Sequence, residues 1–299
     1  MDRIKLIGLY VQLHFIVVLL GFTAILGALI SIDAISLVWF RMFFATAGLF
    51  VFLKFKKLSA RVSRKQLLHL FFIGVLVALH WITFFHAIKV SNVSVTLGVF
   101  ASITLFTSFL EPIMQKRRIF WFEVLTGLVI ILGIYLIFQY EMQYVEGILF
   151  SLLSALLNSF FVVLNRNINI KHQWHPALVA FYEMAGGFIA ITIFYLATQQ
   201  LKPELLYIGW TDFGWILILS FVCTSYAFTA IVEIMKELSA YTVVLAINLE
   251  PVYGIFLAFL IFGEAETMSS GFYVGTLIIM ISVFSYPYLK RKILLNRRY

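Results

Sequence analysis

Ten apolar runs, each about 20 residues long, dominate this sequence and decide what it can fold into. An α-helix rises about 1.5 Å per residue, so about 20 residues cross the hydrocarbon core of a bilayer, which is about 30 Å thick. We place the runs at residues 8–30, 35–54, 67–88, 93–114, 121–139, 147–165, 177–197, 213–235, 239–262 and 269–288. The sequence therefore predicts an all-α integral membrane protein with ten transmembrane helices.

The composition excludes a soluble domain. Apolar residues make up 63% of the chain and charged residues 12%, whereas soluble proteins are about half apolar and about a quarter charged. The polar residues are too few to cover the surface of a globule in water. The single cysteine, Cys223, excludes a disulfide framework and a cysteine-based metal cluster. We expect no cofactor and no metal.

The basic residues indicate how the chain is oriented in the membrane. The net charge is +8, but Lys and Arg occur in short clusters beside the apolar runs, which is typical of membrane topology rather than of nucleic-acid binding. All but three of the 22 fall on one side; Lys89 and Lys202 lie on the other, and Arg41 lies inside a run. Because basic loops stay in the cytoplasm, we expect both termini there. The expected partner is the lipid bilayer, with no nucleic acid.

The ten runs divide into two halves of five. Five is an odd number, so two such halves must lie inverted in the membrane. We place the first five-helix repeat at residues 1–143 and the second at residues 144–299. Short matches recur in the same order in both; Gly127 in the fifth run, for example, has its counterpart 148 residues later in Gly275, in the tenth. The sequence predicts an inverted repeat.

Glu250 lies about midway along the ninth run and is followed by Pro251. An ionisable side chain at a helix centre costs about 2.5–3.5 kcal/mol in a membrane, so it should face a cavity or a partner. Proline interrupts the helix, and interrupted helices at mid-depth are where transporters hold substrates and ions. We interpret Glu250 as a substrate-binding residue. The alternative is a kink that serves packing, with Glu250 bonded to a neighbouring helix.

A second group of polar residues lies one turn from the centre of the membrane. Arg41 in the second run is displaced to the outside, and Tyr182 and Glu183 in the seventh are displaced to the cytoplasmic side. An inverted repeat predicts this displacement, because the second and seventh runs are counterparts. Such positions suit a gate, or the binding of opposite ends of a zwitterion. The alternative is that Arg41 extends to the surface or forms a structural pair.

Six further side chains are predicted at a similar depth, where together they would line one pocket. They are His80, Trp81, Ser102, Asn158, Tyr226 and Asn248. His80 either relays a proton or hydrogen-bonds a neighbouring helix, and Trp81 either packs or forms a platform for substrate. We exclude Glu111 and Glu233 from the pocket, because each lies close enough to a basic cluster to reach the cytoplasmic interface.

These features together resemble the EamA family of the drug/metabolite transporter superfamily along nearly the whole chain. The resemblance rests on the two halves of five spans and on four short motifs. They are Phe40-Arg41-Met42, Ser239-Ala240-Tyr241 before the ninth run, Glu250-Pro251, and Gly263-Glu264 at the end of that run. The first half differs, with Ser102-Ile103 where the second has Glu250-Pro251.

The resemblance implies a carrier of the inner membrane that moves amino acids, other metabolites or drugs, often outward. It also implies a central cavity lined by spans one to four and six to nine, with spans five and ten at the periphery. We therefore expect a secondary transporter, a permease or exporter working by alternating access, as a monomer or homodimer. If a proton is coupled, Glu250 is the first candidate to carry it and Glu183 the second.

The alternative function is that of a polytopic membrane enzyme acting on lipid substrates. Such enzymes need clustered Asp, His or metal ligands held in loops at the interface. The predicted loops of this chain carry scattered single acids, with no nucleophile motif and no glycine-rich phosphate loop. The sequence therefore favours a transporter and no enzymatic activity.

Overall fold

The structure, a computed structural model, describes residues 3–58, 61–116, 118–172, 174–235, 237–238, 243 and 246–296. All regular secondary structure in these ranges is helical. The long helices are α1 (Arg3–Leu29), α2 (Ala34–Phe55), α3 (Arg64–Val90), α6 (Trp121–Tyr140), α7 (Val145–His172), α8 (Pro176–Ala197) and α13 (Ser270–Asn296). The shorter ones are α4 (Val93–Phe100), α5 (Ile103–Met114), α9 (Trp210–Leu217), η3 (Ile218–Tyr226, a π-helix), α10 (Ala227–Met235) and α12 (Glu250–Phe262), with 3-10 turns η1 (Met142–Tyr144), η2 (Pro203–Leu206) and η4 (Gly263–Glu266).

Eight segments in these ranges are long and apolar enough to cross a membrane, and they correspond to the first eight predicted runs. The ninth and tenth spans are not confirmed. Most of residues 239–249, the start of the ninth predicted run, lies outside the described residues, and the rest of that run is described as α12, with 13 residues. The tenth run corresponds to α13, a helix of 27 residues in which residues 270–285 form an apolar stretch.

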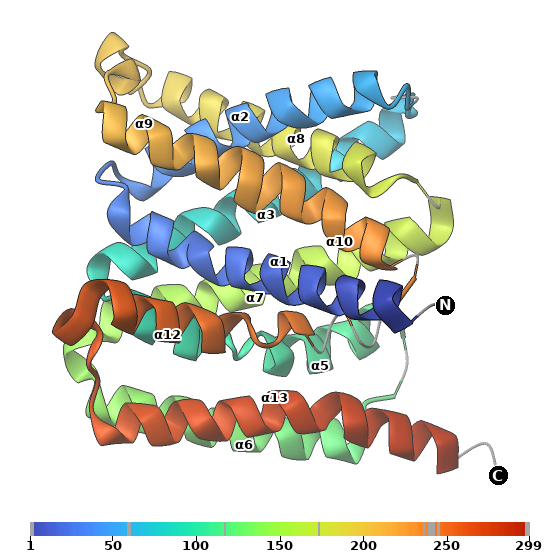
Figure 1. The fold of residues 1–299 in the computed structure, drawn as a ribbon, viewed down its shortest axis with the longest axis vertical. Helices are drawn as coiled ribbons and strands as arrows, with labels where there is room; N and C mark the ends of the chain where they lie inside the picture. The colour runs from blue at the N-terminus through green and yellow to red at the C-terminus, as the bar shows by residue number, and fades with distance from the viewer. Residues whose placement is uncertain are drawn as a thin grey trace.

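Successive long segments run in opposite directions, with α4 and α5 forming one segment and α9, η3 and α10 another (Figure 1). Both termini lie at one end of the molecule, and the connections that follow α1, α3, α6, α8 and α12 lie at the other. Lys89 and Lys202 belong to this second end, which we call the Lys-poor end; the first is the Lys-rich end. Large apolar side chains are exposed along most of the helices, and such a surface is suited to hydrocarbon rather than to water.

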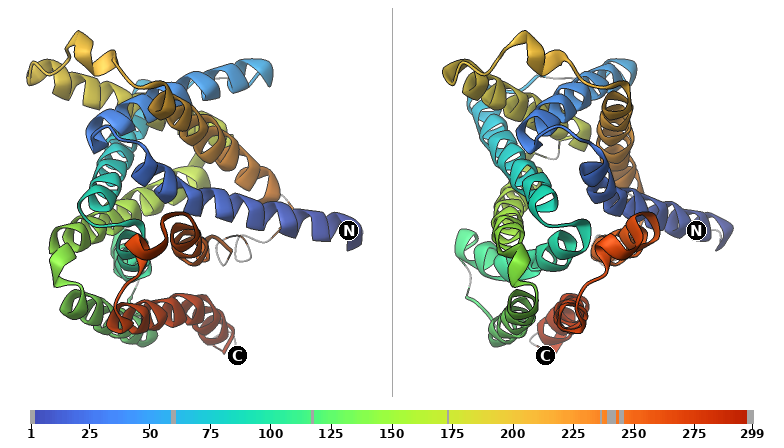
Figure 2. Two further views of the ribbon diagram at one scale, coloured as in Figure 1. Left: turned by 60° about the vertical axis from the view of Figure 1, so that its left-hand side comes forward. Right: turned by 90° about the vertical axis from the view of Figure 1, so that its left-hand side faces the viewer.

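Helices α6 and α13 pack on each other at the edge of the molecule (Figure 2). Their next most extensive contacts are those of α6 with α5 and of α13 with α4. The other helices surround a large apolar core that extends from α1 to α12. The central helices are therefore α1 to α5 and α7 to α12, which is the set that holds the predicted polar residues.

The contacts between helices recur when each is replaced by its counterpart in the other half. Helix α1 packs on α12 and α10, and α7 correspondingly packs on α5 and α3. Helix α2 packs on η3, and α8 correspondingly packs on α3. The pairs α2 with α8 and α6 with α13 map onto themselves.

Polar residues at the helix ends set where the central helices begin. The Asp33 carboxylate accepts hydrogen bonds from the first backbone N–H groups of α2, and Ser63 forms a capping box with Gln66 at the start of α3. Helix α8 begins with Pro176, which has no N–H to leave unpaired. These caps fix the depth at which the side chains of α2, α3 and α8 lie.

Helices α3 and α8 approach each other very closely. A side chain at Gly74 would clash with the backbone carbonyl of Glu183, and one at Gly187 would clash with Met42. Glycine at these positions lets the helix backbones touch, as is common where membrane helices pack. This close packing holds the α8 backbone around Glu183 in place.

Candidate substrate-binding site

Two of the central segments are interrupted midway along their length. The segment formed by α4 and α5 turns at Ala101–Ser102, where the Ser102 N–H donates to the Val99 carbonyl. The segment that leads into α12 turns at Asn248–Leu249, where the Leu249 N–H donates to the Ala246 carbonyl. Proline explains only the second turn. Sequence analysis gave no signal for the first, and Pro112 lies inside α5 without interrupting it.

Arg41 is buried in α2, with 3% of its surface exposed. Its guanidinium lies over the Trp81 ring at 3.6 Å from the centroid, and its Nε donates a 3.0 Å hydrogen bond to the Thr224 Oγ1. Its Nη1 is buried and has no hydrogen-bond partner. Arg41 therefore does not extend to the surface, and it has an unused donor inside the protein.

Glu250 is the first residue of α12, and it interacts electrostatically with Arg41. No ion pair within 4.0 Å joins these two side chains. The N-terminus of a helix favours a negative charge, so α12 and Arg41 both stabilise the ionised form of Glu250. Because α12 crosses α1 closely at Gly21 and Gly254, this end of the helix is held against α1.

His80 is buried in α3 and uses both ring nitrogens. Nδ1 lies 2.8 Å from the Ser154 Oγ, and Nε2 lies 3.1 Å from the amide nitrogen of Asn158, both on α7. The Ser154 hydroxyl donates in turn to the His80 carbonyl, and Phe100 stacks on the ring at 5.5 Å. A neutral imidazole with its proton on Nδ1 satisfies this arrangement. The structure thus favours the interhelical hydrogen-bonding interpretation of His80 over a proton relay.

The groups around Arg41, namely Trp81, Phe85, Thr224, Glu250, His80 and Ser154, are called the Arg41 cluster below. Glu183 is also buried, with 1% of its surface exposed, but none of its described interactions is with this cluster. Its carboxyl group hydrogen-bonds the side chain of Asn165 on α7. The Glu183 Oε1 and the Asn165 Oδ1 are both buried without a partner.

The remaining predicted site residues are distributed around these groups. Ser102 is fully buried at the turn between α4 and α5, and its hydroxyl has no partner; Asn248 is half-buried at the other turn. Tyr182 is half-buried and its ring contacts Phe181. Tyr226 is 43% exposed, and no contact joins it to the Arg41 cluster. The parts that these four residues take in binding stay predictions.

Three residues of the cluster were missed by sequence analysis. Thr224 binds the Arg41 Nε, Ser154 binds His80, and Phe85 lies with its ring centroid 5.6 Å from the guanidinium. Thr224 lies in η3, and its hydroxyl donates to the Leu219 carbonyl five residues earlier. The polar residues from Cys223 to Tyr226 were the signal for this segment in the sequence. In the structure they lie in a π-helix, and π-helices often occur at functional sites.

Glu111 is 6% exposed, and its Oε1 accepts a hydrogen bond from the Gln115 side chain in α5. Its reach to the cytoplasmic interface stays a prediction. The side chain of Glu233 lies outside the described residues. No group of three His, Cys, Asp or Glu within the described ranges could hold a metal ion.

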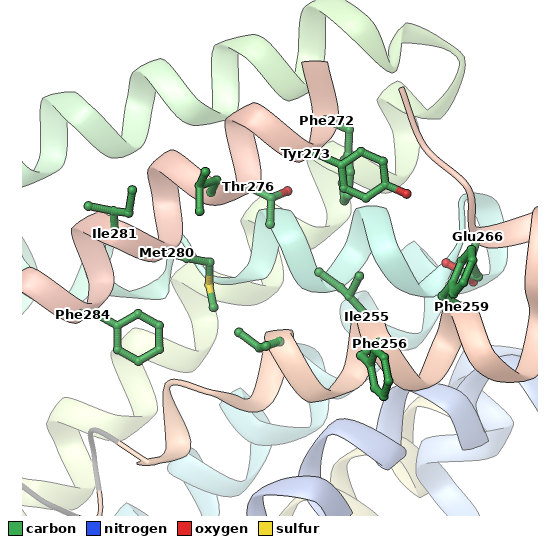
Figure 3. Close-up of a pocket in the computed structure, with 12 residues that line it drawn as sticks. Ile255, Phe256, Phe259, Glu266, Phe272, Tyr273, Thr276, Met280, Ile281 and Phe284 are labelled. Carbon is green, nitrogen blue, oxygen red and sulfur yellow. The ribbon is translucent and has the colours of Figure 1, made fainter. Parts of the chain in front are cut away.

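One hollow of the described surface lies between the last two α-helices. It is a groove of about 540 Å³ between α12 and α13, lined mostly by Phe, Ile, Leu and Met side chains (Figure 3). A smaller hollow lies beside Phe40 and Trp210. The wall of the groove is apolar, and Thr276 and Glu266 are its polar members. The groove is suited to hydrocarbon rather than to a polar substrate.

Comparison with family models identifies two consecutive copies of one family. The model of the EamA-like transporter family matches residues 9–139 and again residues 145–286. The chain belongs to the EamA-like transporter family. The resemblance noted in the sequence is thereby confirmed, and the EamA family places the chain among membrane transporters of the drug/metabolite superfamily. The boundary predicted between residues 143 and 144 falls between the two matches.

Solved structures agree with this fold. One crystal structure has a TM-score of 0.64 and covers 94% of this chain and 98% of its own, at 15% sequence identity. A likeness at this identity shows the fold alone. Comparison with curated proteins finds no match.

Proposed function

We propose that this EamA-family protein is a secondary transporter that moves a small zwitterionic metabolite, such as an amino acid, by alternating access. We infer the substrate class from the Arg41 cluster. A buried guanidinium with an unused Nη1 lies within electrostatic reach of the Glu250 carboxylate, and the two do not neutralise each other in direct contact. A carboxylate of the substrate would bind Arg41, and its ammonium group would bind Glu250.

Trp81 and the surrounding aromatic rings complete this proposal. The guanidinium stacks on Trp81, so the ring fixes the direction in which Nη1 points. An apolar side chain of the substrate would lie against these rings. Trp81 is therefore proposed to position Arg41, and the aromatic walls would favour an amphipathic substrate.

Alternating access requires two halves of related structure, and three features support an inverted repeat of ten spans. Helix contacts recur between counterparts, as described above. The two mid-depth turns lie 147 residues apart, close to the spacing of Gly127 and Gly275. Arg41 and Glu183 are each the eighth residue of a 22-residue helix, α2 and α8.

The proposed orientation has the Lys-rich end, with both termini, in the cytoplasm and the Lys-poor end outside the inner membrane. Cys223 is the only cysteine and is buried, so Cys223→Ser gives a background for labelling. We expect Met142→Cys to react with a membrane-impermeant maleimide in intact cells and Arg61→Cys to react only after lysis. Labelling of Arg61→Cys in intact cells would reverse the orientation.

The transport proposal predicts that Glu250→Gln abolishes substrate movement while the protein stays folded in the membrane. The variant keeps the size of the side chain and removes the charge that would bind the ammonium group. The measurement is uptake of a radiolabelled mixture of amino acids into proteoliposomes that contain the same mixture unlabelled. Glu264→Gln, on the exposed turn η4, is the matched control and should transport as the wild type does. Wild-type exchange by Glu250→Gln would remove Glu250 from the site.

A further inference from the structure

Glu183 is a buried acid that the proposed substrate site does not use. It lies seven residues into α8, about 10 Å from the Lys-rich end of that helix at about 1.5 Å per residue. Its carboxyl group faces Asn165 of α7 rather than Arg41 or Glu250. With 1% of its surface exposed, it is closed to water in this conformation.

The side chains of Glu183 and Asn165 together lack one hydrogen-bond donor. An ionised carboxylate and an amide oxygen are both acceptors only, yet the Glu183 Oε1 and the Asn165 Oδ1 are buried with no donor for either. A buried acceptor without a donor is unfavourable, because it has lost its hydrogen bonds to water. A proton on the Glu183 Oε1 makes it a donor that the Asn165 Oδ1 can accept. A carboxylic acid and a primary amide can then form two complementary hydrogen bonds.

No charged group compensates an ionised Glu183 among the interactions described for it. The titratable residues on the two helices packed most extensively against α8 are Arg41 and Lys54 on α2, and Arg64, Lys65, His69, His80, His86 and Lys89 on α3. None of them interacts with Glu183. On α10, which also contacts α8, the side chain of Glu233 lies outside the described residues, as do those of Arg166, Lys171 and His172 on α7.

Glu250 provides the contrast within the same protein. It has Arg41 as an electrostatic partner and starts a helix, so its ionised form is stabilised. Glu183 has a neutral amide in place of a cation, and it lies in the second turn of its helix. Glu250 therefore has a cation to compensate a negative charge, and Glu183 has none among its described interactions.

We propose that Glu183 and Asn165 form a proton-binding site, separate from the substrate site, and that the proton bound there is the coupling ion of transport. When a conformational change exposes the carboxylate to water, one O–H bond of a hydronium ion breaks and one O–H bond forms at the Glu183 Oε1, leaving a water molecule. Release on the other side is the reverse step, and no electron is transferred. The coupling part rests on the proposed transport function. It makes Glu183, rather than Glu250, the proton carrier.

Infrared spectroscopy of the purified full chain in lipid nanodiscs tests the bound proton directly. We expect the C=O stretch of a protonated carboxyl group at neutral pH, absent in Glu183→Gln and retained in Glu250→Gln. Asn165→Leu should shift this band to higher frequency, because the carboxyl O–H loses its acceptor. A spectrum without the band at neutral pH, or a band that persists in Glu183→Gln, overturns the proposal. Loss of the band when sodium replaces potassium would also overturn it, because a metal ion would then occupy the site.

Proteoliposomes with a pH-sensitive dye inside test the coupling. Addition of the amino-acid mixture outside should change the internal pH for the wild type. For Glu183→Gln the pH change should fall to the background of empty liposomes, while exchange of labelled for unlabelled amino acids continues. A pH change of wild-type size in Glu183→Gln overturns the coupling. If the wild type itself moves no amino acid, the transport proposal fails, and the infrared band still decides whether Glu183 holds a proton.

Discussion

Replacement of Arg41 by Met should lower the free energy of unfolding by about 3–5 kcal/mol, the range measured when one partner of a buried charge pair is removed. Met keeps much of the volume beside Trp81, so the loss reflects the charge and the hydrogen bond to Thr224 rather than a cavity. Glu250 would be left with no cation to compensate it among its described interactions. The measurement is thermal and denaturant unfolding of the protein in nanodiscs.

The same variant should no longer be stabilised by amino acids. A ligand present at about 100 times its dissociation constant stabilises the folded state by about 2.7 kcal/mol, and we expect this gain to vanish in Arg41→Met. Arg41→Lys keeps the charge but loses the planar contact with Trp81 and the Nε donor. Compared with Arg41→Met, it should therefore restore more of the free energy of unfolding than of the amino-acid binding. The double variant Arg41→Met with Glu250→Gln should regain most of the stability and none of the binding. Unchanged stabilisation by amino acids in Arg41→Met would leave Arg41 as a packing residue.

Hydropathy predicted the first eight spans and the positions of the polar residues along them. Arg41 and Glu250 were selected because each lies within an apolar run, and the structure brings both to one cluster. Depth is readable from sequence because each run must match the thickness of the hydrocarbon core. The rotation of one helix against the next is set by packing, so the stacking of Arg41 on Trp81 could not be read in this way.

Asn165 is a proposed site residue at the end of the sixth predicted span, and the candidate membrane span in the structure ends at the same residue. The sixth run was predicted to end at residue 165, because Arg166, Asn167 and Asn169 follow it. Helix α7 instead continues to His172, so Asn165 lies two turns inside the helix and reaches Glu183. Polar residues ended the apolar run but not the helix. Hydropathy records the first of these ends, and backbone hydrogen bonding decides the second.

The carboxylate of Glu266 should be the most important polar group at the Lys-poor end. It is 5% exposed on η4, between α12 and α13, and it accepts hydrogen bonds from the N–H groups of Val93 and Ser94, at 3.0 and 2.7 Å. These are the first two N–H groups of α4, and the third, of Val95, binds the Asn92 side chain. A residue of the second half thus caps a helix of the first.

Glu266→Ala should lower the free energy of unfolding by about 2–4 kcal/mol, because two buried N–H groups lose their acceptor at about 1–3 kcal/mol each and the end of α4 loses a favourable charge. Glu266→Gln keeps one acceptor oxygen and should recover about half of the loss. Glu264→Ala, which removes an exposed carboxylate from the same turn, is the matched control and should change stability by less than about 0.5 kcal/mol. Unfolding in nanodiscs measures all three variants. Equal stability of Glu266→Ala and Glu264→Ala would show that α4 does not depend on this cap, and that the two halves are joined at the Lys-poor end by other contacts, such as that of Asp212 with Ser31.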